Sequence, residues 1–184
     1  MSYLTRSSYA TPRNLCELLL RDVASLLATS QLVGRSLYTL RPECAFSPEL
    51  TETLDSIVTT SKAGESHLHQ PLVEAGAVLP PASDAAANAL VTGLFTRLPA
   101  ALAPGVLAAE IAVNLRLLAQ HIELKARLAA EEALLVGQNK LCQALIAWAA
   151  EWRACGEVLR SATVRARAQA YVADLGQIPA AKGT

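Results

Sequence analysis

Residues 104–175 read PGVLAAEIAVNLRLLAQHIELKARLAAEEALLVGQNKLCQALIAWAAEWRACGEVLRSATVRARAQAYVADL. After Pro104 this stretch contains no proline, and Ala, Leu, Glu, Arg, Gln and Lys dominate it. These residues lose little side-chain freedom in a helix and are the strongest helix formers. The best turn signal within the stretch is Gly137-Gln138-Asn139. The stretch therefore predicts two long antiparallel helices, about 105–136 and 139–175, joined near Gly137.

Two more helices are predicted before this stretch. The first begins at Asn14, a good N-cap, carries leucine and valine at helical spacing and stops before Pro42. The second begins with Ser47 as N-cap and Pro48 in the first turn, and it ends at Gly76. Together the four segments predict an all-α protein.

The connection over residues 77–103 decides how the helices are joined. It is too long for a hairpin, and Ser83-Asp84 within it are placed to cap a short helix that reaches Leu98. Such a connection lets the third long helix run parallel to the second, which is the ferritin-like topology. We predict a ferritin-like four-helix bundle whose long crossover carries a short extra helix. Residues 13–176 form this single domain, between a flexible segment over residues 1–12 and a disordered tail over 177–184.

The overall composition excludes several kinds of partner. Hydrophobic residues make up 52% of the chain and aromatic residues only 4%, so the core must be aliphatic. Sixteen basic and 16 acidic residues cancel, which argues against nucleic-acid or anionic-membrane binding. Charged residues interrupt every helix that could cross a bilayer, and the N-terminus has no apolar signal core. We therefore expect a cytoplasmic protein with neither nucleic acid nor membrane as partner.

The scarce cysteines and tryptophans favour structural roles. The four cysteines form no CxxC pair, so we expect free thiols in a reducing compartment. Trp148 and Trp152 are four residues apart and share one helix face. Because aromatic residues are otherwise rare, we expect them in the core or in a dimer interface rather than around a cofactor.

A ferritin-like bundle raises the question of a carboxylate-bridged metal pair. Such sites take a Glu from each of two helices and a Glu-x-x-His from each of the other two. The positions three residues before the three histidines hold Gly64, Ser66 and Leu118. The absence of any Glu-x-x-His counts against a di-iron oxidase.

A reduced metal site can still be drawn from scattered residues. Glu65 and His69 are four apart on the second helix, and Glu110 and His121 lie along one side of the third, with Asn114 between them and Asp22 on the first helix. If these residues converge, they form a single-metal site or a buried polar network. The favoured alternative is that Glu65 and His69 face solvent and that Glu110 serves the helix dipole. We therefore assign no catalytic or cofactor-binding residue and expect no metal, with Glu65, His69, Glu110 and His121 as the ligands if one is bound.

Three pieces of sequence resemble the YciE/YciF-type ferritin-like family. They are LCELLLRDVASLLATSQLVGRSLYTL from Leu15, SPELTETLDSIVTTSKAGESHLHQPLVEAG from Ser47, and EIAVN from Glu110. The resemblance implies a ferritin-like fold, a link to stress responses and a dimer. The ligand Glu of the family's first helix falls on Ser30, no Glu and His pair matches in the second helix, and only Glu110 matches a ligand position. The resemblance thus implies a degenerate member that has lost its metal centre.

These observations lead to one hypothesis and two alternatives. The favoured hypothesis is a non-enzymatic bundle that acts as a structural or protein-interaction module, as a homo-oligomer with the dimer preferred, and with a protein partner that the sequence does not identify. The first alternative is a divergent di-metal carboxylate oxidase or metal-storage protein that holds iron or manganese on the residual Glu and His ligands. The second is a binder of an apolar small molecule between the helices.

Overall fold

The computed structural model describes residues 14–41, 44, 47–97 and 104–177, which form five α-helices and no strand. The two predicted hairpins are α1 (Leu15–Leu40) with α2 (Pro48–Glu74), and α4 (Pro104–Leu135) with α5 (Asn139–Gln177). The short crossover helix is α3 (Ala85–Arg97). The all-α prediction is confirmed, with helix ends within a few residues of those expected.

Local capping determines where the first two helices begin. The Asn14 side chain accepts a hydrogen bond from the Glu17 N–H at 2.9 Å, and the Ser47 hydroxyl accepts one from the Leu50 N–H at 3.4 Å. Each cap satisfies an N–H group that has no partner within its own helix. The predicted turn between α4 and α5 is also present, because Gly137 adopts a φ of 76° that favours glycine.

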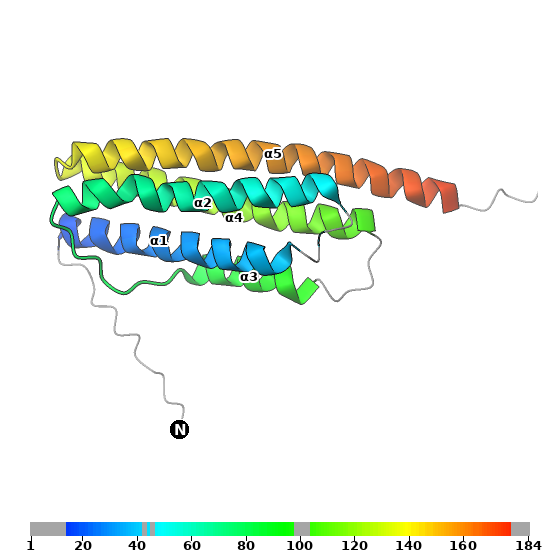
Figure 1. Ribbon diagram of the computed structural model, residues 1–184, viewed down its shortest axis with the longest axis horizontal. Helices are drawn as coiled ribbons and strands as arrows, with labels where there is room; N and C mark the ends of the chain where they lie inside the picture. The colour runs from blue at the N-terminus through cyan, green and yellow to red at the C-terminus, as the bar shows by residue number, and fades with distance from the viewer. Residues whose placement is uncertain (1–13, 42–43, 45–46, 98–103, 178–184) are drawn as a thin grey trace, which may run out of the picture.

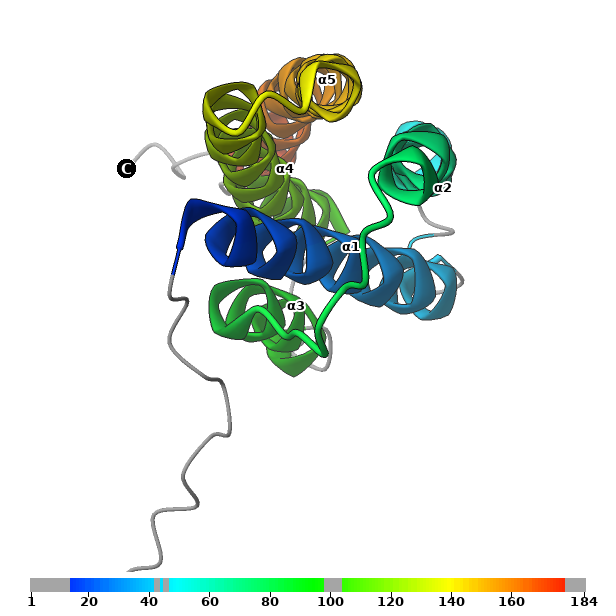
Figure 2. The ribbon, with the colours of Figure 1, turned by 90° about the vertical axis from the view of Figure 1, so that its left-hand side faces the viewer.

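The four long helices form a bundle, and α3 lies against one side of it. In Figure 1, α2 and α4 run in the same direction, and the crossover returns along the length of the bundle between them. Each long helix contacts two others, in the order α1, α2, α5, α4 and back to α1. Helix α3 packs against α1 and α4 (Figure 2). The predicted ferritin-like topology is therefore confirmed.

The core is a single aliphatic cluster that reaches all five helices. Helix α4 contributes many small side chains to it, which allow close approach of its neighbours. Its buried alanines are Ala108, Ala109, Ala112, Ala119, Ala126, Ala129, Ala130 and Ala133. Trp148 and Trp152 lie in this core with 0% and 1% exposure, so the core role predicted for them is confirmed.

Three details refine the predictions from sequence. Helix α2 includes Pro71 and ends at Glu74, two residues before the predicted end at Gly76. Helix α5 includes Gln177 and extends beyond the start of α4, as Figure 1 shows. Of the segments predicted to be flexible or disordered, 1–12 and 177–184, residues 1–12 and 178–184 lie outside the described residues, whereas Gln177 belongs to α5. No helix of the described chain is long and apolar enough to span a bilayer.

Candidate functional site

The most polar buried site in the described chain is centred on Asp84, which precedes α3. Its side chain is only 6% exposed. Oδ1 accepts hydrogen bonds from the N–H groups of Ala86 and Ala87, each at 3.0 Å. This is the N-cap arrangement predicted for Ser83-Asp84, so the capping prediction is confirmed.

The other carboxylate oxygen of Asp84 joins α3 to α1 and α4. Nε2 of His121 lies 2.8 Å from Oδ2, and Nζ of Lys125 donates to it at 2.9 Å. The Thr29 hydroxyl reaches the same oxygen at 3.3 Å, and Lys125 also donates to the Ser25 hydroxyl at 2.7 Å. Three helices thus meet on one carboxylate.

The electrostatics of this centre keep Asp84 ionised. Burial alone would raise the pKa of Asp84, but the hydrogen bonds from Lys125 and His121 and the N–H of Ala87 outweigh it. The pKa of the Asp84 carboxyl is held well below the usual range of an aspartate. Because both oxygens are already bound by donors, the carboxylate is poorly placed to act as a general base or metal ligand.

The pair formed by Ser25 and Lys125 also lacks the properties of a catalytic dyad. A lysine activates a serine by accepting its proton, which requires a neutral amine. Here Nζ of Lys125 is bound to the Asp84 carboxylate and donates to the Ser25 hydroxyl instead of accepting from it. Ser25 is itself only 7% exposed. The Asp84 centre therefore fits a structural connection among α1, α3 and α4.

A second buried polar contact joins α1 to α2 in the middle of the bundle. Ser30 and Ser61 are 0% and 1% exposed, and their hydroxyl oxygens lie 2.7 Å apart. The Ser61 hydroxyl lies 2.7 Å from the backbone carbonyl oxygen of Ser30. The Ser30 hydroxyl lies 2.9 Å from the backbone carbonyl oxygen of Ser61. These contacts satisfy both side chains, and Ser30 is the position onto which the resemblance places a ligand Glu.

Trp148 fills the space beside this pair and explains the unusual glycine in α2. A Cβ atom added to Gly64 would lie 1.9 Å from the Trp148 ring, far closer than any real contact. The Trp148 indole N–H also donates to the Thr60 carbonyl at 3.3 Å. The side of α2 that faces α5 is therefore occupied by an aromatic ring at the level where a metal ligand would be sought.

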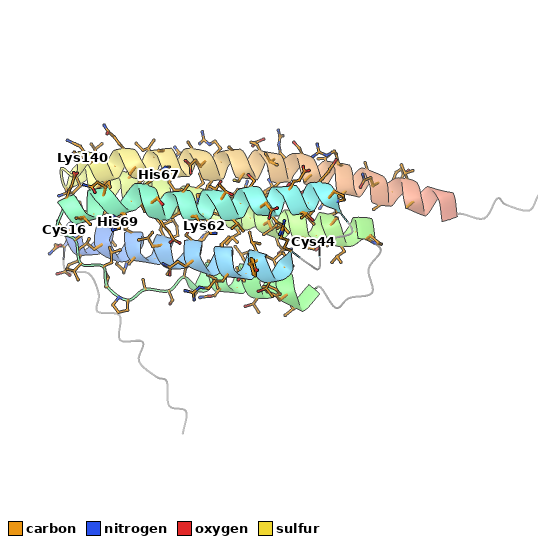
Figure 3. All side chains as sticks on the ribbon, viewed as in Figure 1. Cys16, Cys44, Lys62, His67, His69 and Lys140 are labelled. Atoms are coloured by element: carbon orange, nitrogen blue, oxygen red, sulfur yellow. The ribbon has the colours of Figure 1, made fainter. Side chains whose placement is uncertain are left out.

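The four residues named as possible metal ligands are not assembled into a site. Glu65 and Glu110 are half-buried, while His69 is exposed on α2 (Figure 3). His121 instead contacts Asp84. Within the described residues, no group of three His, Cys, Asp or Glu side chains could hold a metal ion.

The cysteines are likewise dispersed. Cys44, Cys142 and Cys155 are buried, Cys16 is exposed, and all four are free thiols. Cys16 and Cys44 lie at opposite ends of the bundle in Figure 3. The prediction of unpaired thiols is confirmed.

The buried ion pair of Asp84 and Lys125 was not predicted from the sequence. Asp84 was predicted only as a helix cap, and His121 as a possible metal ligand. One signal was available, because His121 and Lys125 are four residues apart and so share a face of α4. Nothing in the sequence indicated that the crossover would place Asp84 on that face.

Comparison with known proteins gives a clear match at the level of the fold. The structure matches the crystal structure of the E. coli stress protein YciF with a TM-score of 0.80, covering 84% of this chain and 98% of that one. The fold is that of YciF. Sequence identity is 12%. YcfI, a putative structural protein from Rhodopseudomonas palustris, matches with a TM-score of 0.75 and 17% identity over 80% of this chain and 94% of its own.

The sequence comparisons add no further relative. No protein-family model matches the chain, and no curated protein matches it. The resemblance to the YciE/YciF-type family is thus confirmed by structure as a YciF-like ferritin-like fold. At 12% identity the match to YciF carries the fold and not the activity.

We expect Asp84→Asn to lower the free energy of unfolding by about 3 kcal/mol, because it leaves the partly buried Lys125 without its counter-charge. Urea unfolding followed by circular dichroism measures the change. Since the folded-state pKa of Asp84 is lowered, its contribution is fully present above the unfolded pKa of about 3.9 and is lost as pH falls below that value. The difference between wild type and variant should therefore shrink in acid.

Asp55→Asn is the matched control for Asp84→Asn. It breaks the exposed ion pair between Arg41 and Asp55, in which both side chains are 52% exposed. Such pairs contribute about 0–1 kcal/mol. Equal losses in the two variants would show that the Asp84 centre is no more than a surface contact.

We expect Gly64→Ala to destabilise the protein by about 2 kcal/mol or more, because its methyl group has no space beside Trp148. Helix propensity alone predicts the opposite sign, since Ala is favoured over Gly by about 1 kcal/mol within a helix. Gly156→Ala is the control, because a Cβ atom there meets nothing within 4 Å. Thermal unfolding of both variants checks the prediction, and a Gly64→Ala protein as stable as Gly156→Ala would contradict the packing described here.

Proposed function

We propose that this chain is a non-enzymatic, YciF-like bundle that serves as a structural or protein-interaction module in the cytoplasm, in a stress-related role and without a metal centre. YciF is described as a stress protein and YcfI as a putative structural protein. Both descriptions agree with a bundle whose role is to present surfaces.

The observation that carries the proposal is the closed middle of the bundle. A metal centre there would need acidic side chains from several helices directed at one point. In this chain Ser30 and Ser61 bond to each other, and the Trp148 ring occupies the space over Gly64. The hydroxyls of Ser30 and Ser61 and the indole N–H of Trp148 thus find their partners among the protein's own residues.

Two surface cavities of the described residues have linings of different character. The groove between α4 and α5, with a volume of about 370 Å³, is lined mainly by apolar side chains. Glu123 on its edge is bound to Arg153 at 2.9 Å. A smaller cavity of about 290 Å³ beside Thr29 reaches Asp84, whose oxygens are already engaged.

Metal analysis tests this proposal against the oxidase or storage alternative. We expect protein purified without chelators to contain far less than one iron or manganese per chain, because the closed middle leaves no set of ligands. Elemental analysis of the wild type, Glu110→Ala and the control Glu157→Ala gives the measurement. One or two metal ions per chain that disappear in Glu110→Ala but persist in Glu157→Ala would overturn the proposal.

A further inference from the structure

The outer face of α4 carries a straight row of exposed leucines. Leu117, Leu124, Leu128 and Leu135 are 47%, 58%, 48% and 74% exposed. Their spacings of seven, four and seven residues place them within about 20° of one line along a helix with 3.6 residues per turn. We call this row the leucine stripe, and at 1.5 Å per residue it is roughly 27 Å long.

The leucine stripe lies directly opposite the part of α4 that enters the core. Ala126, on the far side of the helix, is fully buried. Figure 2 shows α5 on one flank of α4 and α1 with α3 on the other, which leaves the outward side without a described helix over it. Leucines aligned on a solvent-facing stripe are characteristic of helices that pack against another helix.

The apolar surface continues from the stripe onto α5. The groove between α4 and α5 lies beside the stripe, and the exposed side chains of Leu134 and Ile146 form part of its walls. This groove spans residues 123–134 of α4, the same length of helix that carries Leu124 and Leu128. The combined surface has a raised row of leucines next to a depression, which suits knobs-into-holes packing.

We propose that the leucine stripe binds the same stripe of a second copy, antiparallel, about a two-fold axis level with Ala126. This inference rests on the proposed function and names the partner and the surface. The row is symmetric about position 126. Leu117 and Leu135 each lie nine residues from it, and Leu124 and Leu128 each lie two residues from it. A two-fold axis therefore places Leu117 opposite Leu135 and Leu124 opposite Leu128, twice each, as a self-complementary interface requires.

Several charged residues beside the stripe come near opposite charges in this pairing, whereas the exposed Glu131 comes within one residue of the level of Gln120 of the other copy. On the flank toward α1, His121 of one copy comes within one residue of the level of Glu132 of the other. A histidine ring has two nitrogens for hydrogen bonding, and only Nε2 is used by Asp84. On the flank toward α5, Arg127 comes within two residues of the level of Glu123 of the other copy. The two Arg127 side chains also approach each other, and each has its own Glu123 at 3.8 Å to offset the repulsion.

Oligomeric state in solution gives the first test. We expect light scattering after size exclusion to show a wild-type dimer at micromolar concentration. Leu124→Glu and Leu128→Glu should each weaken it by roughly 100-fold, because carboxylates from both copies would be forced together at the axis. Val73→Glu is the control, since Val73 is 60% exposed on α2, and it should remain a dimer. Because dimerisation itself stabilises the folded chain, unfolding midpoints are compared at a concentration low enough for wild type and variants all to be monomeric. Equal midpoints there would confirm that the substitutions act on association.

Cysteine cross-linking tests the direction of pairing in the same full-length chain. In a Cys16→Ser background, Leu117→Cys and Leu135→Cys chains should form disulfide-linked dimers when mixed, because their Cα atoms must approach to about 4.4–6.8 Å. Leu117→Cys alone should not cross-link, since the two copies of residue 117 lie roughly 27 Å apart along an antiparallel pair. Cross-linking of Leu117→Cys with itself would overturn the antiparallel arrangement.

Other outcomes overturn the proposal without ambiguity. A wild-type monomer, or a dimer that Leu128→Glu leaves intact, removes the stripe as a self-association surface. A monomer that floats with phosphatidylcholine or phosphatidylglycerol vesicles and loses this in Leu128→Glu would assign the stripe to a membrane surface. None of these measurements depends on metal content. They can therefore contradict the proposed dimer without contradicting the proposal of a metal-free bundle.

Discussion

A carboxylate buried among helices must find its hydrogen bonds within the protein, and the placement of the crossover depends on how Asp84 meets this requirement. Its two oxygens accept from the backbone of α3, from α1 and from α4. Removal of Lys125 would leave the buried carboxylate without its ammonium partner, and removal of Asp84 would leave the Lys125 ammonium without its counter-charge. The position of α3 is thereby tied to two of the four long helices.

In the middle of the bundle, the helices are positioned by close packing of side chains of complementary size. Helix α2 can approach α5 only because Gly64 has no side chain where the Trp148 ring lies. On the opposite side, α2 meets α1 through the small side chains of Ser30 and Ser61. Small residues on α2 thus serve two neighbours at once, and the interior level that could house ligands in a ferritin-like bundle is closed by packing.

Local signals in the sequence predicted most of the fold. Asn14, Ser47 and Asp84 act as caps through contacts two or three residues away, and Gly137 adopts its turn conformation without distant partners. Such features depend on nearest neighbours in the chain, so a single sequence contains them. The length of the crossover then predicted that the third long helix runs parallel to the second, and the family resemblance implied the same ferritin-like fold.

The contacts that define the site were beyond the same reasoning because they join distant residues. Lys125 is 41 residues from Asp84, and Trp148 is 84 residues from Gly64. From the sequence, Gly64 was considered as the residue three positions before His67, and the packed structure identifies the Trp148 ring that requires a glycine there. His121 was considered as a ligand for a metal, whereas its observed partner is the cap of the crossover helix.

The distribution of leucine explains how one helix can belong to a core and still direct apolar side chains outward. Helix α4 buries Leu115 and Leu118 and exposes Leu117 and Leu124, so its apolar residues do not gather on one side. A helix that is apolar on opposite faces has two surfaces to cover. The bundle covers one of them. The exposed leucines of α4 lie in one row on its outer face, and this directs the search for function to the outside of the bundle.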